Sequence, residues 1–215
     1  MPFRLQVTTV VVSPFEQNCR VVKDLDSGDG VVVDPGDEAE RILQAVEQSG
    51  ARITHILATH AHLDHVGAAA SVRRALKAPF CLHRADLPLL RALPEHGVMF
   101  GMQGLEVPPV DLDLADVSEI PLGQGRIRVL HTPGHTPGGV TFLFDGDGFF
   151  GDSLFRLSVG RTDLGGDARV YARTLQDVIL GLPDATVVRC GHGPDTTIGV
   201  ERRENPFLNG TYRLV

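Results

Sequence analysis

Four side chains that can bind metal ions fall within one short stretch of this sequence, spaced H-x-H-x-D-H: His60, His62, Asp64 and His65. The stretch directly follows an apolar run, residues 53–58, and a short apolar run of this kind predicts a buried strand that feeds a loop. Side chains two residues apart point to the same side of an extended chain but diverge on a helix, so His60 and His62 can bind one ion only from extended backbone. The stretch therefore predicts a metal site on a loop at the end of a strand.

Asp64 and His65 open the next element of the chain. A rough helical period of apolar residues predicts a helix from about 65 to 77, with Asp64 near its N-terminus, where exposed N–H groups favour a carboxylate. Four ligands on so tight a segment cannot all reach one ion comfortably. We therefore expect two ions about 3.5–4 Å apart, with His60 and His62 on one and Asp64 and His65 on the other.

Three later loops have the same character: an apolar strand, a Gly or Pro turn, and then a ligand-type residue. They present His135 after Pro133-Gly134, Asp152 at the end of an apolar hairpin, and His192 after an apolar strand. A rigid sheet can aim side chains from several strand-end loops at one point. This shared pattern favours a metal site over a chance cluster of histidines.

Strands and helices alternate along the chain without a repeat of fixed short period. Apolar and alternating runs predict strands at 4–12, 18–23, 30–34, 53–58, 79–82, 126–130, 140–144, 148–151 and 186–190. Helices are expected between Pro35-Gly36 and Gly50, at about 65–77 and at about 168–181. Residues 83–115, broken by prolines and glycines, are either a short helix with a Met- and Phe-containing loop at the site mouth or a plain connector. Because no linker-like stretch divides it, we expect one domain, residues 1–215.

Taken together, seven residues resemble the complete ligand set of the metallo-β-lactamase superfamily: His60, His62, Asp64, His65, His135, Asp152 and His192. The resemblance covers nearly the whole chain and implies an α/β fold, the αβ/βα four-layer sandwich of two mixed β-sheets with helices on the outer faces. It also implies that His60, His62 and His135 bind one ion. Asp64, His65 and His192 would bind the second, and Asp152 would bridge the two. Asp64 would also be catalytic, orienting a bridging hydroxide by a hydrogen bond.

Within the superfamily the chain is similar to the glyoxalase II-like, or hydroxyacylglutathione hydrolase-like, group, especially its short members. The similarity lies in Asp34-Pro35-Gly36 and in residues 151–155, 160–167, 191–194 and 201–207. It implies a binuclear metal-dependent hydrolase, a thioesterase in which a metal-bridging hydroxide attacks the thioester carbonyl. The implied cofactors are two divalent metal ions, zinc first and iron or manganese as alternatives. The implied partner is a small-molecule thioester, with a glutathione derivative as the natural test.

Substrate recognition is where the sequence departs from that group. Full-length glyoxalase II enzymes carry a helical C-terminal domain that contributes basic residues to glutathione's carboxylates, whereas this sequence ends 23 residues after His192. Arg161 stands where those enzymes use a lysine, and Asp163 and Pro194 stand where they use tyrosines. Arg161 is therefore our candidate substrate-binding residue, with a structural ion pair to Asp163 or Asp167 as the alternative.

Three other functions stay open. A mononuclear iron persulfide dioxygenase of the same superfamily would use the His60, His62, His135 and Asp152 positions, although His192 favours the binuclear hydrolase. A lactonase or β-lactamase would use the same machinery, and the lack of a secretion signal argues against the β-lactamase. A non-catalytic scaffold would be expected to have lost ligands, and this sequence keeps them all.

Bulk properties exclude several classes of partner. The formal net charge of −7 argues against binding to a nucleic-acid backbone. No apolar stretch approaches the ~20 residues that a membrane span requires, and the first residues lack a signal-peptide cleavage pattern. The three cysteines are widely spaced and suggest neither a disulfide framework nor a cysteine zinc site. We expect a cytoplasmic enzyme without nucleic-acid or membrane partners.

The remaining conspicuous residues have structural interpretations. We expect buried, unreactive positions for His55, Tyr171 and Cys190, a supporting role at the turn before His135 for His131, and surface positions for His83 and His96. The free ring N–H groups of the ligand histidines are expected to meet Thr59, Thr136 or backbone carbonyls.

Overall fold

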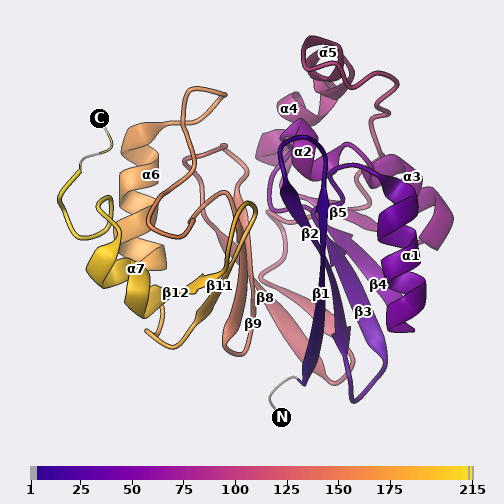
Figure 1. Ribbon diagram of the computed structural model, residues 1–215, viewed down its shortest axis with the longest axis horizontal. Helices are drawn as coiled ribbons and strands as arrows, with labels where there is room; N and C mark the ends of the chain where they lie inside the picture. The colour runs from indigo at the N-terminus through magenta and orange to yellow at the C-terminus, as the bar shows by residue number, and fades with distance from the viewer. Residues whose placement is uncertain (1–3, 213, 215) are drawn as a thin grey trace.

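Two six-stranded β-sheets pack face to face in the computed structural model of this protein, which describes residues 4–212 and 214 (Figure 1). The first sheet has the order β1-β2-β3-β4-β5-β6, formed by β1 (Leu5–Val12), β2 (Gln17–Asp24), β3 (Asp29–Val33), β4 (Arg52–Leu57), β5 (Phe80–Leu82) and β6 (Leu112–Asp113). The second has the order β12-β11-β10-β9-β8-β7, formed by β7 (Glu119–Leu122), β8 (Gly125–His131), β9 (Val140–Phe144), β10 (Asp147–Gly151), β11 (Val187–Cys190) and β12 (Thr196–Thr197). Both are mixed: β1 to β3 are antiparallel and β3 to β6 parallel, while β10 and β11 form a parallel pair in an otherwise antiparallel second sheet.

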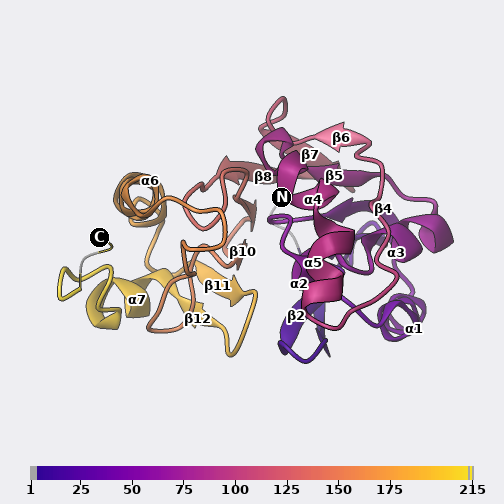
Figure 2. The ribbon, with the colours of Figure 1, turned by 90° about the horizontal axis from the view of Figure 1, so that it is seen from above.

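Helices cover the two outer faces of this pair of sheets. They are α1 (Ala39–Ser49) and α3 (Ala69–Leu76) beside the first sheet, and α6 (Ala168–Thr174) and α7 (Ile198–Glu204) beside the second (Figure 1). Shorter helices gather at one edge, as the view from above shows: α2 (Leu63–Val66), α4 (Leu87–Arg91) and α5 (Leu93–Met99), with a 3-10 turn at Arg84–Asp86 (Figure 2). The layers run helix, sheet, sheet, helix, which confirms the predicted αβ/βα sandwich.

Three apolar clusters fill the spaces between these four layers. The central cluster joins the inner faces of the two sheets, with Val31 and Leu57 from the first and Phe142 and Phe144 from the second. The outer two lie beneath the helices, for example around Ile42 of α1. Burying one large apolar side chain stabilises a fold by about 1.5–3 kcal/mol, so these clusters hold the sheets rigid behind the loops at their ends.

A two-residue turn joins β9 and β10 in the predicted hairpin. Its residues, Asp145 and Gly146, have φ values of 46° and 150°. Two-residue hairpins require positive φ, which aspartate and glycine tolerate better than other residues. The hairpin fixes the register of β10 and so delivers Asp152 to the edge where the short helices lie.

The predicted helix over 65–77 was wrong in one respect, because the chain forms two helices there. The N–H of Ala68 donates to the carbonyl of Pro35 at 3.0 Å, and α3 restarts at Ala69. A Cβ on Gly67 would lie 2.4 Å from the carbonyl oxygen of Gly36. The close approach of this loop interrupts the helix, and a glycine makes the approach sterically feasible.

The C-terminal half contains elements that the sequence patterns did not reveal. The helix expected at 168–181 is α6 followed by a π-helical turn, Leu175–Ile179. Strands β6, β7 and β12 and helix α7 were not predicted, because each is too short to show a clear hydrophobic period. Within the described residues, no helix has the length and apolar character needed to cross a membrane.

Candidate metal centre

The loop after β4 carries His60 and His62, and the backbone of His62 is extended, as the spacing predicted. His62 has φ −69° and ψ 150°, and α2 begins at the next residue, which places Asp64 in the first helical turn. The Nδ1 atom of His62 lies 2.9 Å from the Nε2 atom of His135. The two rings therefore point their nitrogens at a common space between β4 and the loop that follows β8.

Ligand-type atoms from the four strand-end loops converge in three groups, and the atoms of each group lie within 4.8 Å of one another: His60, His62 and His135; His60, His65 and Asp152; Asp64, His65 and His192. The two oxygens of Asp152 face different groups, with Oδ2 3.5 Å from Nε2 of His135 and Oδ1 3.2 Å from Nε2 of His65. On the far side, Oδ2 of Asp64 lies 3.1 Å from Nε2 of His192. The fold thus brings together all seven residues singled out from the sequence.

The donor set fits divalent cations. The Nε2 atom of His60 is buried and has no hydrogen-bond partner among the described residues, and such a buried polar atom costs about 1–3 kcal/mol if nothing binds it. The Nε2 atoms of His65 and His192 lie 3.3 Å apart and point at each other. Imidazole and carboxylate donors at this spacing suit zinc, iron or manganese.

The other ring nitrogen of each of the five histidines faces an oxygen atom. Nδ1 of His60 lies 3.1 Å from Thr59 Oγ1, Nε2 of His62 3.0 Å from Leu164 O, Nδ1 of His65 3.0 Å from Asp34 Oδ2, Nδ1 of His135 2.6 Å from Arg161 O, and Nδ1 of His192 2.9 Å from Phe15 O. Metal-ligating histidines nearly always donate in this way, because the bond fixes both the tautomer and the ring orientation. The expected supports, Thr59 and backbone carbonyls, are therefore present, whereas Thr136 bonds elsewhere.

Asp34 is a buried carboxylate whose role the sequence patterns had not shown. It follows β3, adopts a positive φ of 53°, and accepts hydrogen bonds from the N–H and hydroxyl of Thr59 at 2.6 and 2.7 Å. Its place at the end of an apolar strand, before Pro35-Gly36, is the same signal that revealed the other loops.

Asp86 is a second buried carboxylate, and it joins two of the ligand-bearing loops. It accepts hydrogen bonds from Ala61 N at 3.0 Å, Thr136 Oγ1 at 2.8 Å and Gly138 N at 2.6 Å. Ala61 lies between His60 and His62, and Thr136 follows His135, so one carboxylate fixes the relative positions of both loops. No sequence signal marked it, because it lies in the irregular segment 83–115.

The pKa shifts of His60, His135 and Asp152 favour the protonation states that bind metal, whereas against burial the neighbouring carboxylates raise the pKa values of His65 and His192. Burial, followed by the charges of the neighbouring histidines, holds the pKa of His60 well below its usual value. Burial also lowers the pKa of His135 to about 4, against the opposing effect of Asp152. For Asp152 itself, burial opposes ionisation, but His65 and the other histidines outweigh it and depress its pKa. Neutral imidazoles beside an ionised carboxylate are the forms that coordinate a cation.

Tyr171 lies in the core, as predicted, and also supports the site. Its hydroxyl lies 2.9 Å from the carbonyl oxygens of Asp152 and Ser153 and accepts from Gly160 N at 3.0 Å. Burial raises the pKa of Tyr171, which keeps the hydroxyl protonated and able to donate. The helix α6 is thereby attached to the backbone that carries Asp152.

Of the other conspicuous histidines, His83 was predicted wrongly as a surface residue. It is buried, its Nδ1 accepts from Ala85 N at 3.2 Å, and its ring stacks on His131 with centroids 4.3 Å apart. His131 supports its turn through Nε2, 3.0 Å from Pro137 O. His96 is half-buried and His55 is half-buried within β4. Cys190 is buried, which raises its pKa to about 12 and makes it unreactive, as expected.

A cleft of about 530 Å³ opens onto the metal-ligating atoms. Residues 83–115 contribute Leu89, His96, Met99 and Phe100 to its lining, which agrees with the site-mouth interpretation of that segment. Arg161 also lines the cleft, and its guanidinium bonds both oxygens of Asp163 at 2.5 Å. The alternative expectation of an ion pair to Asp163 is therefore what the structure contains.

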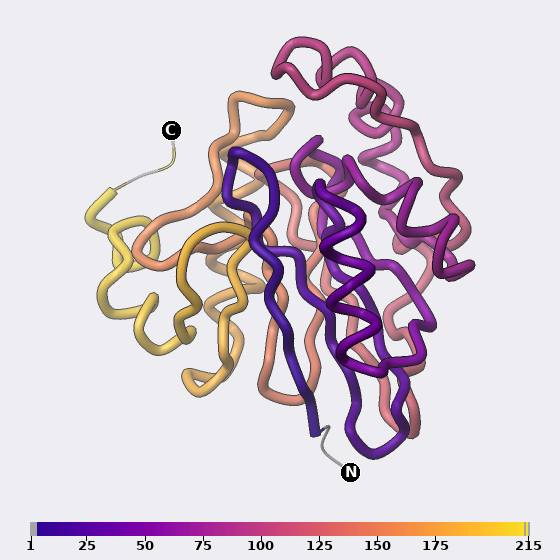
Figure 3. Tube along the Cα trace, turned by 45° about the vertical axis from the view of Figure 1, so that its right-hand side comes forward, coloured from indigo at the N-terminus to yellow at the C-terminus, as the bar shows by residue number. Residues whose placement is uncertain are grey.

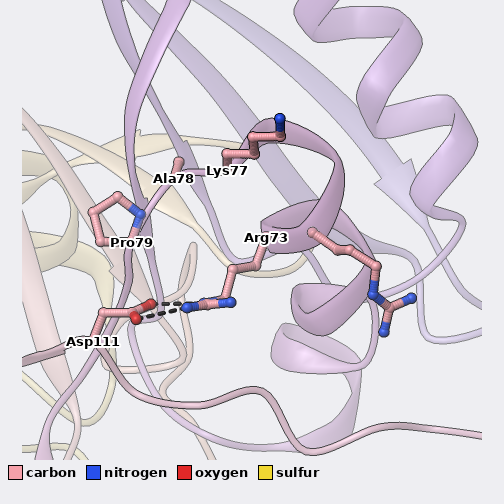
Figure 4. A pocket seen from close by; sticks show the side chains of 6 residues that line it. Arg73, Lys77, Ala78, Pro79 and Asp111 are labelled. Carbon is pink, nitrogen blue, oxygen red and sulfur yellow. Dashed lines mark hydrogen bonds and ion pairs between the residues drawn. The ribbon is translucent and has the colours of Figure 1, made fainter.

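A second depression, formed by the end of α3 and the segment before β5, carries the basic side chains of Arg73, Arg74 and Lys77. Among the described residues, no metal-ligand group lies there. Arg73 forms two hydrogen bonds to Asp111, each at 2.7 Å, as Figure 4 shows, and Arg74 pairs with Glu106. Asp111 also accepts from Phe80 N at 2.8 Å. These contacts attach α3 and β5 to the loop before β6, and they give the charges of Arg73 and Arg74 structural partners.

Comparison with known proteins agrees with this geometry. The family model described as the metallo-beta-lactamase superfamily matches residues 12–192. The hydroxyacylglutathione hydrolase GloC of Haemophilus influenzae is 36% identical over 210 residues, covering 95% of this chain and 99% of that protein. Among solved structures, the BLEG-1 B3 metallo-beta-lactamase has a TM-score of 0.88 and 36% identity, covering 95% and 100% of the two chains. TTHA1623, in a di-iron-bound form, has a TM-score of 0.84 and 40% identity, covering 94% and 100%.

The fold and the site define a metal-binding hydrolase built on a four-layer sandwich. The family match and the relatives then give the particular family: this chain belongs to the metallo-beta-lactamase superfamily and is a homologue of hydroxyacylglutathione hydrolase GloC.

Proposed function

We propose that this protein is a binuclear metal-dependent thioesterase of the glyoxalase II type. His60, His62 and His135 would hold one divalent ion, Asp64, His65 and His192 would hold the second, and Asp152 would be shared by both. The observation that carries the proposal is the position of Asp152, whose two oxygens face His135 on one side and His65 on the other. A carboxylate so placed can share two cations, which a mononuclear site does not need.

Two ions, when bound, would supply an activated water at neutral pH and would polarise the substrate carbonyl. The chain contributes orientation. Asp64 is held ionised, because the charge of His65 and a hydrogen bond from His192 outweigh burial and lower its pKa. We assign it the role of accepting a hydrogen bond from the attacking water, which aligns that water on the acyl carbon. Hydrolysis then breaks the carbon–sulfur bond, and a thiolate leaves with little need of a general acid.

The relative named as a hydroxyacylglutathione hydrolase supports thioesters as the substrate class. The test is metal content per chain, measured beside hydrolysis of S-D-lactoylglutathione. Two equivalents with turnover are the expected result. Two equivalents without turnover of any thioester would reject thioester hydrolysis while leaving the binuclear site, and a chromogenic cephalosporin and a lactone would then be the next substrates.

Metal identity defines the competing function. Zinc is our expectation, and the di-iron form of TTHA1623 supports iron as the alternative. One equivalent of iron, with oxygen uptake on addition of a persulfide and no thioester turnover, would instead indicate a mononuclear dioxygenase. The 3.1 Å approach of His192 to Asp64 favours the binuclear hydrolase, because it completes a second group of ligands.

A further inference from the structure

Apart from the metal-ligating residues, His96, Arg161 and Gly165, the wall of the metal cleft is apolar. Phe15, Leu63, Leu89, Met99, Phe100 and Leu164 line it. They come from three separate parts of the chain: the turn between β1 and β2, the α2 to α5 region, and the loop before α6. These segments rise around one edge of the sandwich (Figure 3).

Four of these residues are exposed to solvent around the opening of the cleft. Phe15 is 40% exposed, Leu164 43%, Phe100 51% and Met99 76%. Single exposed apolar residues are ordinary, but several that converge on one concave site mark a ligand surface. Phe15 and Phe100 meet edge to face with ring centroids 5.8 Å apart, so segments far apart in sequence form one continuous surface.

The same wall offers little to a charged thiol. Among the described residues that line the cleft, Arg161 is the one arginine or lysine. Its guanidinium already bonds both oxygens of Asp163, so its charge is largely offset. Glutathione carries two carboxylates, and unpaired cations are among the strongest hydrogen-bond donors to such groups.

We propose that this apolar wall selects thioesters whose acyl group is a hydrocarbon chain, in preference to thioesters of glutathione. The inference rests on the proposed thioesterase function and deepens it. With the thioester carbonyl at the metal-ligating residues, the chain runs along Leu63 and Leu89 towards Met99 and Phe100. Each methylene that leaves water there adds to binding, and the volume of the cleft accommodates a chain of this kind.

The test uses the metal-loaded full chain and a series of N-acetylcysteamine thioesters with acetyl, butanoyl and hexanoyl groups, followed by release of the thiol. We expect kcat/KM to rise about 2- to 4-fold for each added methylene, as half to full burial of each group gives. The kcat/KM for S-D-lactoylglutathione should be lower than the kcat/KM for the hexanoyl thioester. A flat or falling series, or a higher kcat/KM for lactoylglutathione, would overturn the proposal.

Variants of the wall residues test whether the apolar wall causes the rise of kcat/KM with acyl chain length. In the double variant Met99→Ser/Phe100→Ser, the rise of kcat/KM with chain length should fall to less than half of its original slope. Val107→Ser is the matched control, because Val107 is also an exposed apolar residue of this region, at 42%, but does not line the cleft. An undiminished slope in the double variant would refute the assignment. Absence of hydrolysis across all thioesters would instead reject the proposed function itself, so the two failures are distinguishable.

Discussion

The Nδ1 atom of His65 lies 3.0 Å from Oδ2 of Asp34, a buried carboxylate. Asp34 also accepts the N–H and the hydroxyl of Thr59, whose Oγ1 lies 3.1 Å from Nδ1 of His60. One buried carboxylate therefore orients histidines of both proposed ion sites, one directly and one through a threonine.

Replacing Asp34 should weaken the binding of both metal ions. In Asp34→Ala we expect the affinity for each to fall about 10- to 100-fold, the usual cost of losing a group that orients a ligand. In Thr59→Val only the ion on His60 should weaken, since His65 keeps its contact with Asp34. Competitive titration with a chelator measures both affinities. Equal effects of the two variants on both ions would contradict this division of roles.

The proposed bridging role of Asp152 predicts a larger loss of bound metal than the replacement of Asp34 does. Asp152→Ala should lose more than one metal equivalent and nearly all hydrolysis, because both groups of ligands share this residue. His131→Ala is the control and should retain both ions, since its ring contacts Pro137 and His83 rather than a ligand. Elemental analysis after gel filtration measures the metal content of both variants. Two tightly bound metals in Asp152→Ala would defeat the assignment.

Much of this site could be predicted because its residues follow strands. His60, His135, Asp152 and His192 each come within four residues of the end of a strand, and a sheet brings the ends of its strands to shared edges. Asp86 could not be predicted in this way. It lies in a 3-10 turn within a segment of prolines and glycines, and its three bonds reach residues 25 to 52 positions away, which no local pattern encodes.

The fold shows the same division between local and tertiary determinants. The helix α1 was predictable from its apolar stripe and from Gly50, which caps it with φ 61°. The break between α2 and α3 was not, since it depends on the contact of Ala68 with Pro35, a residue of a different loop.

Replacing Asp86 should destabilise the folded protein. Asp86→Asn places an amide N–H₂ against backbone and hydroxyl donors, so we expect a loss of about 2–4 kcal/mol in the free energy of unfolding. Asp116→Asn is the matched control: Asp116 pairs with Arg84 on the surface, and its loss should cost less than about 1 kcal/mol. Urea unfolding of the two variants checks this, and similar values for both would show that the network around Asp86 contributes little.

Arg161 should matter little to substrate binding. Its side chain is exposed and paired with Asp163, and it is the backbone carbonyl that contacts His135. Arg161→Ala should therefore keep both ions and change the KM for S-D-lactoylglutathione by less than about 3-fold, since an exposed ion pair is worth about 0–1 kcal/mol. A KM increase of about 10-fold or more, or 1.4 kcal/mol, would restore it as a substrate-binding residue.

The stacked pair His83 and His131 should make stability depend on pH. Burial first, and then the charge of His131, lower the pKa of His83 below its usual 6.5. The neutral ring is thus favoured in the folded state, where Nδ1 accepts from Ala85 N and cannot carry a proton. Because the pKa of His83 is lower in the folded protein than in the unfolded chain, its contribution to the free energy of unfolding depends on pH. The contribution is fully present above the unfolded pKa of 6.5 and is lost as pH falls through the folded pKa.

The corresponding variant is His83→Gln, which cannot titrate. We expect it to be less stable than the wild type at pH 7.5, with the difference in the free energy of unfolding narrowing as pH is lowered to 5. Taking the difference removes the effects of the histidines that do not contact His83, which both proteins share. Thermal or urea unfolding at the two pH values measures it. A difference that stays constant or widens on acidification would mean that His83 takes up its proton in the folded protein as readily as in the unfolded chain, and that its stacking on His131 does not oppose the charge.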